Sequence, residues 1–209
     1  IRKSSGICVL IHGLPGAGKT EMVLQYAKKS ERKIFKVESA SIKSKWLGES
    51  ENNTKLIFQE YKKFCKNETL KPILFFNEAD SLISRRIDAS AYADTVANSM
   101  QNILLEELEN FDGIFFATTN LIQNIDNAFD RRFLFKIKFD MPDIQIRSKI
   151  ICEKLKFLAN HEADNLAAKY SLSGGEIENI ARKIEIEVLL NGKYPSIETI
   201  ENFFENEVS

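Results

Sequence analysis

Short runs of apolar residues alternate with helix-like segments over the first two thirds of the chain. The runs at 7–11, 73–76 and 114–117 are continuous, which is typical of strands that are buried on both faces. Apolar residues at 96–111 recur instead at intervals of three and four, as on one face of an amphipathic helix. Two further strand-like runs stand at residues 34–37 and 135–139. This alternation predicts an α/β fold with a parallel sheet and right-handed crossovers.

A different pattern begins after Pro142. No strand-like run recurs there, and helical spacing continues to the end of the chain, broken by pairs such as Gly174-Gly175. The sequence therefore predicts two domains, an α/β domain at 1–141 and an all-helical domain at 142–209. The expected helices of the second domain lie at residues 147–157, 176–190 and 196–204.

The composition is that of an ordinary folded protein. Of 209 residues, 44% are apolar and 28% are charged, and 29 basic residues nearly balance 30 acidic ones. That balance argues against a mainly electrostatic binder of nucleic acid or membranes, and no apolar run is long enough to span a bilayer. The three cysteines, Cys8, Cys65 and Cys152, fit neither a disulfide framework nor a zinc site, which favours a cytoplasmic setting. Because Ile1 stands directly before a strand-like run, we expect a fragment of a longer protein.

The strongest chemical signal is a glycine-rich segment between the first predicted strand and a helix. Its glycines allow backbone amides to face phosphates, and the following helix N-terminus favours an anion. In such a loop Lys19 reaches the β- and γ-phosphates and the Thr20 hydroxyl binds Mg²⁺. The segment matches the pattern G-x-x-x-x-G-K-[ST] and consists of Gly13, Leu14, Pro15, Gly16, Ala17, Gly18, Lys19 and Thr20.

A second polar cluster follows the apolar run 73–76. A nucleoside triphosphatase needs a further anchor for Mg²⁺ and a base that polarises water, both at the tip of a neighbouring strand. Asn77 is the candidate for the metal anchor and Glu78 for the base. Taken alone, Glu78 would be read as a solvated loop carboxylate, and it gains its assignment from the phosphate loop.

With these motifs in this order, the chain resembles the AAA+ ATPase family and, within it, the branch of protein-remodelling AAA ATPases. The resemblance extends from residue 7 to about residue 204. It implies a five-stranded parallel sheet of order 5-1-4-3-2, flanked by helices and followed by a small helical lid. It also implies ATP as the nucleotide and assembly into a homo-oligomeric ring, most often a hexamer.

The resemblance assigns further residues. Asn120, after the run 114–117, matches the polar sensor that positions the attacking water. Arg131 and Arg132 match arginine fingers, which act on the nucleotide of a neighbouring subunit. Gly175 matches the small residue of the lid that packs near the adenine and ribose.

A loop at residues 45–51 resembles the first pore loop of the family. There Trp46 and Leu47 would project into the ring channel and grip an extended polypeptide. An alternative is a core tryptophan that anchors a loop. The function that the resemblance implies is ATP-driven remodelling or threading of a macromolecular substrate, with a protein as the expected substrate.

The chain departs from the family at Asn77, where the norm is aspartate before the catalytic glutamate. An amide still offers a carbonyl oxygen but no charge. The departure leaves a working ATPase and a nucleotide-gated scaffold with weak hydrolysis as alternatives.

Three other classes of protein are alternatives to this interpretation. A small-molecule kinase would lack the paired arginines, and a GTPase would carry an Asn-Lys-x-Asp segment, which this sequence does not contain. A DNA-acting AAA+ protein would need a stripe of basic residues.

Overall fold

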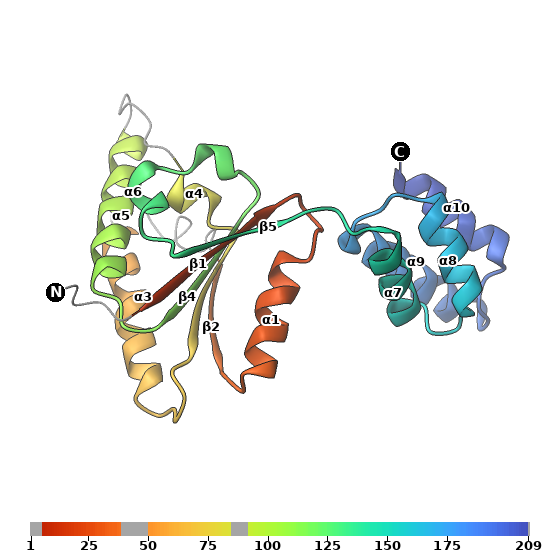
Figure 1. Ribbon diagram of the computed structural model, residues 1–209, viewed down its shortest axis with the longest axis horizontal. Helices are drawn as coiled ribbons and strands as arrows, with labels where there is room; N and C mark the ends of the chain where they lie inside the picture. Colours follow the sequence, from red (N-terminus) through yellow and green to blue (C-terminus); the bar gives the residue numbers. More distant parts are fainter. Residues whose placement is uncertain (1–5, 39–49, 85–91, 209) are drawn as a thin grey trace. The chain divides into compact units, whose positions relative to one another are not determined.

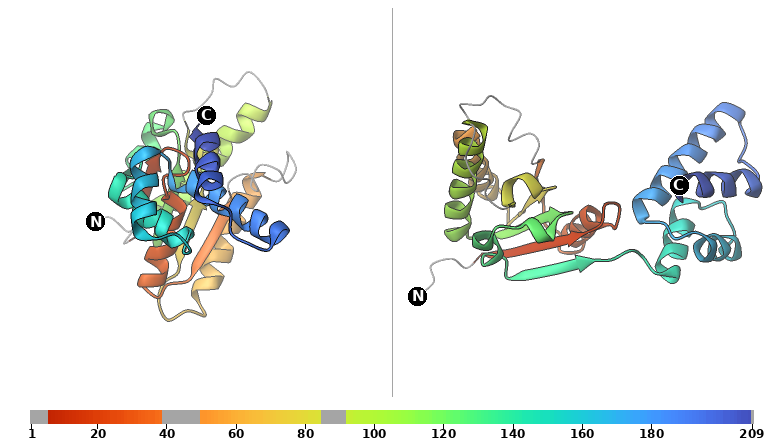
Figure 2. Two further views of the ribbon diagram at one scale, coloured as in Figure 1. Left: turned by 90° about the vertical axis from the view of Figure 1, so that its right-hand side faces the viewer. Right: turned by 90° about the horizontal axis from the view of Figure 1, so that it is seen from above.

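Five parallel strands form the sheet of the first part of the chain (Figure 1). The computed structural model describes residues 6–38, 50–84 and 92–208. The spatial order is β2-β3-β4-β1-β5, which confirms the predicted order read from the other edge; β5 is the outermost strand on one side of the sheet (Figure 2, right). The strands are β1 (Ile7–Gly13), β2 (Ile34–Glu38), β3 (Ile73–Asn77), β4 (Ile114–Thr119) and β5 (Phe135–Phe139).

The strand register aligns the polar ends of the strands. In the paired strands, Glu38 lies opposite Asn77, and His12 lies opposite Thr119. Because carboxyl ends of parallel strands meet at one edge, the residues that follow β1, β3 and β4 are brought together there. This register places the candidate chemistry of three distant segments along one side of the sheet.

Helices cover both faces of this sheet. On one face, Phe58 and Leu104 pack on alternate strand residues such as Leu74. On the other face, Tyr26 lies against Phe116 with the ring centroids 5.4 Å apart. Coverage of both faces explains why the strands read as continuous apolar runs. The helices are α1 (Lys19–Lys29), α3 (Ser50–Cys65), α4 (Asp80–Ile83), α5 (Tyr92–Glu109) and α6 (Asn127–Asp130), with a 3₁₀ turn η1 (Ile122–Asn124).

Aromatic rings dominate the core between the sheet and helices α3 and α5. Phe58, Tyr61 and Phe115 each contact Phe111 edge-on or tilted, at centroid distances of 5.4 to 6.2 Å. The Tyr61 hydroxyl donates to the carbonyl of Pro72 at 2.8 Å, and burial raises the pKa of this phenol. A buried hydroxyl needs such a partner, so the bond ties α3 to the residue before β3.

The second part of the chain is all helical, as expected. Its core comprises side chains such as Ile151, Leu166 and Phe204, all at most 2% exposed. Ser173 caps α9 by accepting from Glu176 N, and Glu176 accepts in return from Ser173 N. The helices are α7 (Ile144–Lys154), α8 (Asn160–Lys169), α9 (Gly174–Asn191) and α10 (Ile197–Val208).

Contacts divide the chain into two compact units. The first contains Ile1–Gly13 and Lys19–Lys138, and the second contains Leu14–Gly18 and Phe139–Ser209. The division into domains 1–141 and 142–209 stays a prediction about which segments fold on their own. In the described part of the chain, no helix has the length and apolar character that crossing a membrane requires.

Candidate functional site

Lys19 lies at the carboxyl edge of the sheet, where α1 begins. Its Nζ donates to the carbonyl of Gly13 at 2.9 Å and to Oδ1 of Asn120 at 2.7 Å. The residue is only 8% exposed. Burial lowers the pKa of the Lys19 ammonium, and the charges of Asp80 and Glu78 oppose that effect. A desolvated cation in this position is suited to an anionic ligand.

The two residues expected at the metal are in direct contact. Thr20 Oγ1 donates to Asn77 Oδ1 at 2.9 Å. Thr118, on β4, donates from its hydroxyl to the same oxygen at 3.2 Å. Two segments far apart in the sequence thus present their side-chain oxygens at one point, and oxygen is the ligand type that Mg²⁺ prefers.

Glu38 is a polar neighbour that sequence reasoning missed. Its Oε2 accepts from Asn77 Nδ2 at 3.2 Å, and Lys36 Nζ lies 2.5 Å from its Oε1. The hydrogen bond from Lys36, and to a lesser degree that from Asn77, holds the pKa of Glu38 below its usual value against the effect of burial. The available signal was its place at the end of a strand-like run, the same rule that singled out Asn77 and Asn120.

Glu78 is exposed at the edge of the sheet, in a backbone conformation that non-glycine residues seldom adopt. Its φ is 53°, a left-handed conformation that costs about 1 kcal/mol or more. Contacts with β4 hold it there: Glu78 N donates to Thr118 Oγ1 at 3.0 Å, and Ala79 N donates to the Thr118 carbonyl at 2.8 Å. Thr118 therefore positions both the Asn77 amide and the candidate base, a role that the sequence did not reveal.

Asp80 fixes the loop that carries Asn120, the candidate sensor. Its Oδ1 accepts from the Thr119 hydroxyl, from Asn120 N at 3.0 Å and from Leu121 N at 3.3 Å. A carboxylate that accepts several backbone N–H groups holds a loop in one conformation. With the loop held in this way, Asn120 Oδ1 is placed to accept the hydrogen bond from Lys19 Nζ.

The paired arginines lie near the amino-terminal ends of the strands, opposite to the carboxyl edge where Lys19 lies. They precede β5, and Leu134 N donates to the carbonyl of Cys8 at 2.9 Å. Five residue steps along β1 separate Cys8 from Gly13, which is about 16 Å. Arg131 and Arg132 are therefore not assembled with Lys19 within one chain.

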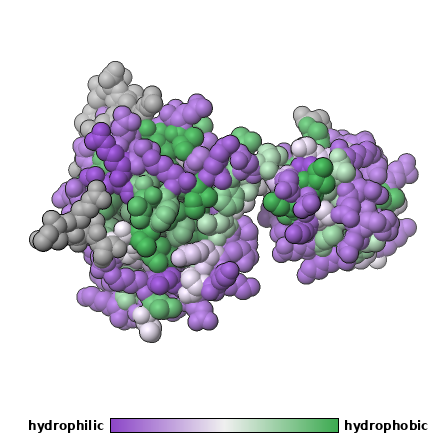
Figure 3. Space-filling view, viewed as in Figure 1, coloured by the Kyte–Doolittle hydropathy of each residue, from purple (hydrophilic) through white to green (hydrophobic). Residues whose placement is uncertain are grey.

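The two arginines differ in their surroundings. The Arg132 guanidinium lies 3.2 Å from Glu109 Oε2, and its Nε is buried without a hydrogen-bond partner among the described residues. Arg131 is exposed, and its side chain makes no ion pair or hydrogen bond with any residue that the structure describes. Just after them, Leu134 and Phe135 are 67% and 52% exposed. Figure 3 shows apolar residues gathered over this part of the first unit, where β5 runs.

Two glycines of the predicted phosphate loop lie in the left-handed region of backbone conformation. Gly16 and Gly18 have φ values of 73° and 93°, which favour glycine. Leu14 and Pro15 between Gly13 and Gly16 are exposed, and Ala17 N donates to the Leu14 carbonyl. Within the second unit, Gly175 N donates to the Gly16 carbonyl at 3.0 Å. Trp46 and Leu47 of the expected pore loop lie outside the described residues.

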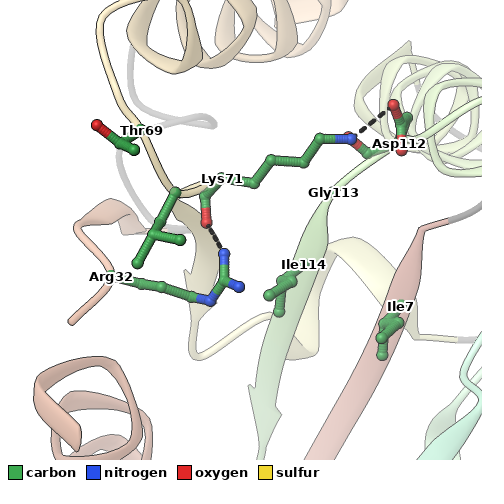
Figure 4. A pocket seen from close by; sticks show the side chains of 8 residues that line it. Ile7, Arg32, Thr69, Lys71, Asp112, Gly113 and Ile114 are labelled. Atoms are coloured by element: carbon green, nitrogen blue, oxygen red, sulfur yellow. Dashed lines mark hydrogen bonds and ion pairs between the residues drawn. The ribbon is translucent and has the colours of Figure 1, made fainter. Parts of the chain in front are cut away.

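A cavity of about 300 Å³ opens at the opposite, amino-terminal ends of the strands. Figure 4 shows an ion pair between Lys71 Nζ and Asp112 Oδ2 at 2.7 Å, and Arg32, which donates to the backbone carbonyl of Lys71 at 2.7 Å. The Asp112 carboxylate in the lining disfavours a second anion, so this cavity is a poorer candidate for a phosphate than the carboxyl edge of the sheet. Its lining consists of Ile7, Arg32, Thr69, Leu70, Lys71, Asp112, Gly113 and Ile114.

The residues at the carboxyl edge fit a nucleotide with Mg²⁺. Lys19 offers a buried positive charge, and Thr20 and Asn77 offer oxygen atoms. The described residues contain no cluster of three histidine, cysteine, aspartate or glutamate side chains that would hold a metal by themselves. Mg²⁺ does not require one, since it keeps several waters and uses one or two protein ligands together with phosphates.

Comparison with known proteins gives the family. Residues 9–141 match the family described as "ATPase family associated with various cellular activities (AAA)". Cell division protein C of Sulfolobus acidocaldarius is 29% identical over 188 residues, which are 87% of this chain and 50% of that protein. Fidgetin-like protein 1 of Drosophila melanogaster is 32% identical over 162 residues, 75% of this chain and 29% of that protein.

A solved structure shares the fold. The crystal structure of the FIGL-1 AAA domain in complex with ADP matches with a TM-score of 0.73 and 20% identity, covering 100% of this chain and 72% of that one. The chain spans half or less of the length of the two relatives named above. The family match, the relatives and the fold agree with the motifs, and the chain belongs to the AAA family of ATPases, in its protein-remodelling branch.

Proposed function

We propose that this chain binds and hydrolyses ATP and uses the energy to remodel or thread a protein substrate. The observation that carries the proposal is the convergence at one sheet edge: the buried Lys19 ammonium meets Asn120, while Thr20 meets Asn77. Three segments of the chain supply these groups, and an ATPase of this family needs all of them together. The ADP bound in the FIGL-1 structure supports an adenine nucleotide.

Each residue has a defined task in this proposal. Lys19 and the amides of residues 16–20 bind the phosphates, and Thr20 and Asn77 hold Mg²⁺. The ion, when bound, supplies positive charge that offsets the charge developing on the phosphate oxygens. Glu78 accepts a proton from the attacking water, and Asn120 orients that water beside Lys19. Gly175 would lie near the adenine and ribose.

Catalysis is completed by a second copy of the chain. Arg131 and Arg132 lie near the amino-terminal ends of the strands, whereas Lys19 lies at the carboxyl ends. They are therefore too distant to reach the nucleotide of their own subunit. They lie next to the exposed Leu134 and Phe135, which a neighbouring subunit would cover. This arrangement supports contact between copies of the chain. We propose a hexameric ring, as the family resemblance implies, and a cytoplasmic setting, which the three scattered cysteines favour.

The substrate would be gripped in the channel of that ring. We assign the grip to Trp46 and Leu47, whose apolar side chains can pack on a polypeptide without requiring one sequence. The family branch and relatives such as the proteasome-activating nucleotidase of Methanosarcina mazei support a protein substrate.

A second candidate function is a nucleotide-gated scaffold with slow hydrolysis. Asn77 favours it, because an amide contributes no negative charge to Mg²⁺. The distinction is kinetic, since a scaffold would bind ATP and change its assembly without sustained phosphate release.

The test compares ATP binding with phosphate release in three proteins. Wild type should bind a fluorescent ATP analogue with Mg²⁺ and release phosphate, with specific activity that rises with protein concentration. Lys19→Ala should lose binding, whereas Glu78→Gln should bind ATP and stall. Phosphate release at the wild-type rate in Glu78→Gln would refute the assigned base, and binding without turnover in wild type would select the scaffold.

A further inference from the structure

Glu38, which no motif includes, lies beside the metal-facing amide. It ends β2 and stands directly opposite Asn77, which ends β3; the two strands are neighbours in the sheet (Figure 1). Asn77 Nδ2 donates to Glu38 Oε2 at 3.2 Å. Because only the nitrogen end of an amide can donate, this contact distinguishes the two ends of the Asn77 side chain.

The opposite end of the same amide is held by hydroxyl groups. Thr20 and Thr118 both donate to Asn77 Oδ1, at 2.9 and 3.2 Å. If the amide turned over, its oxygen would face the Glu38 carboxylate, and two acceptors would stand together without a proton between them. Glu38 therefore selects the orientation that directs an oxygen at Thr20.

The carboxylate is itself fixed in place. Lys36 Nζ lies 2.5 Å from Glu38 Oε1, while Glu38 Oε2 faces Asn77. Each oxygen of Glu38 thus has its own partner. A series of side-chain contacts thus leads from Lys36 through Glu38 and Asn77 to Thr20, at the start of α1.

We propose that Glu38 is a positioning residue for the metal side of the site: by accepting from Asn77 Nδ2, it keeps the carbonyl oxygen of Asn77 directed at the metal. The proposal rests on the function proposed above, because it concerns Mg²⁺–ATP at that site. It explains how an asparagine can serve at a position where the family norm is aspartate.

The proposal has a consequence that a merely structural role would not share. An aspartate at position 77 needs no orienting partner, since both of its oxygens can face the metal. It would also place a second carboxylate at hydrogen-bond distance from Glu38, and the two like charges would repel each other. Removal of the Glu38 carboxylate should therefore weaken Mg²⁺ binding in the natural protein and strengthen it in the Asn77→Asp variant.

The experiment is a double-mutant cycle with wild type, Glu38→Ala, Asn77→Asp and the double variant. The measured quantity is the Mg²⁺ concentration that gives half-maximal binding of a fluorescent ATP analogue. Groups that orient a metal ligand are worth about 10- to 100-fold in metal affinity, so Glu38→Ala should raise that concentration by about this factor. In the Asn77→Asp background the same substitution should lower it. Glu38→Gln, which keeps an acceptor but removes the charge, should fall between wild type and Glu38→Ala.

Glu60→Ala is the matched control. Glu60 is also exposed and paired with a lysine, Lys63, at 2.7 Å, but lies on α3 away from the strand ends. It should leave the Mg²⁺ requirement unchanged. Thermal melting without nucleotide checks that every variant is folded.

The outcomes separate this inference from the function on which it rests. If wild type binds Mg²⁺–ATP and Lys19→Ala does not, the nucleotide site stands. In that case an unchanged Mg²⁺ requirement in Glu38→Ala, or the same change in both backgrounds, overturns the role of Glu38 alone. If wild type binds no ATP at any Mg²⁺ concentration, the nucleotide function and this inference both fall.

Discussion

Substitution of the two arginines provides the sharpest test of catalysis between subunits. Arg131 is exposed, so Arg131→Ala should change the free energy of unfolding by no more than about 0.5 kcal/mol. Loss of an arginine finger lowers turnover by roughly 10³–10⁵-fold, about 4–7 kcal/mol of transition-state stabilisation. We therefore expect Arg131→Ala to fold and bind ATP normally and to lose hydrolysis.

Arg132→Ala should behave differently. Its partner Glu109 is 64% exposed at the side chain, so the ion pair contributes only about 0.2–1 kcal/mol. To reach a neighbouring nucleotide, Arg132 must give up that pair and move its buried Nε. We expect a measurable loss of melting temperature and a smaller loss of turnover than for Arg131→Ala.

The assay is steady-state phosphate release from mixtures of inactive subunits. Lys19→Ala subunits lack a nucleotide site but keep both arginines, whereas Arg131→Ala subunits keep the site. Mixed assemblies should regain activity where an intact arginine faces an intact site, and the activity should depend on the mixing ratio. The reasoning is refuted if no ratio restores activity, or if Arg131→Ala alone hydrolyses ATP at the wild-type rate.

Three further predictions concern buried side chains of the first unit. Tyr61→Phe removes the hydroxyl that donates to Pro72, which should cost about 1–2 kcal/mol and lower the melting temperature by roughly 2–8 °C; an unchanged melting temperature would show that the bond is not formed in solution. Burial raises the pKa of the Cys8 thiol from 9.0 to about 11, against the opposing charge of Arg132, so iodoacetamide at pH 8 should modify the partly exposed Cys65 and Cys152 well before Cys8. Because the folded state holds the Cys8 proton more tightly, this thiol favours folding below pH 9, and its contribution should fall as pH rises from 9 to 11. Equal modification rates for the three cysteines in the native protein would contradict its burial.

Local pattern was sufficient for the sheet and most helices. Strands buried on both faces must be apolar throughout, so runs such as 73–76 could be read directly, and the order followed from the family resemblance. Helix α8 was missed because its apolar face is narrow and consists mainly of small side chains. Its buried residues are Ala163, Leu166 and Ala167. Helix boundaries also shifted by a few residues, because capping by residues such as Asp143 determines where a helix begins.

The sequence by itself determined which groups of this protein are the candidates for chemistry: the loop that ends in Lys19 and Thr20, and the polar residues at the ends of β3 and β4. It could do so because phosphate binding depends on a short continuous segment whose residue types are constrained. Only the tertiary structure decided how those groups are oriented. The contacts of Glu38 with Asn77, of Thr118 with Glu78 and of Asp80 with Asn120 join strands that are neighbours in space but about 40 residues apart in the chain. Such contacts depend on strand register, and strands that are buried on both faces carry no alternating pattern from which the register could be read.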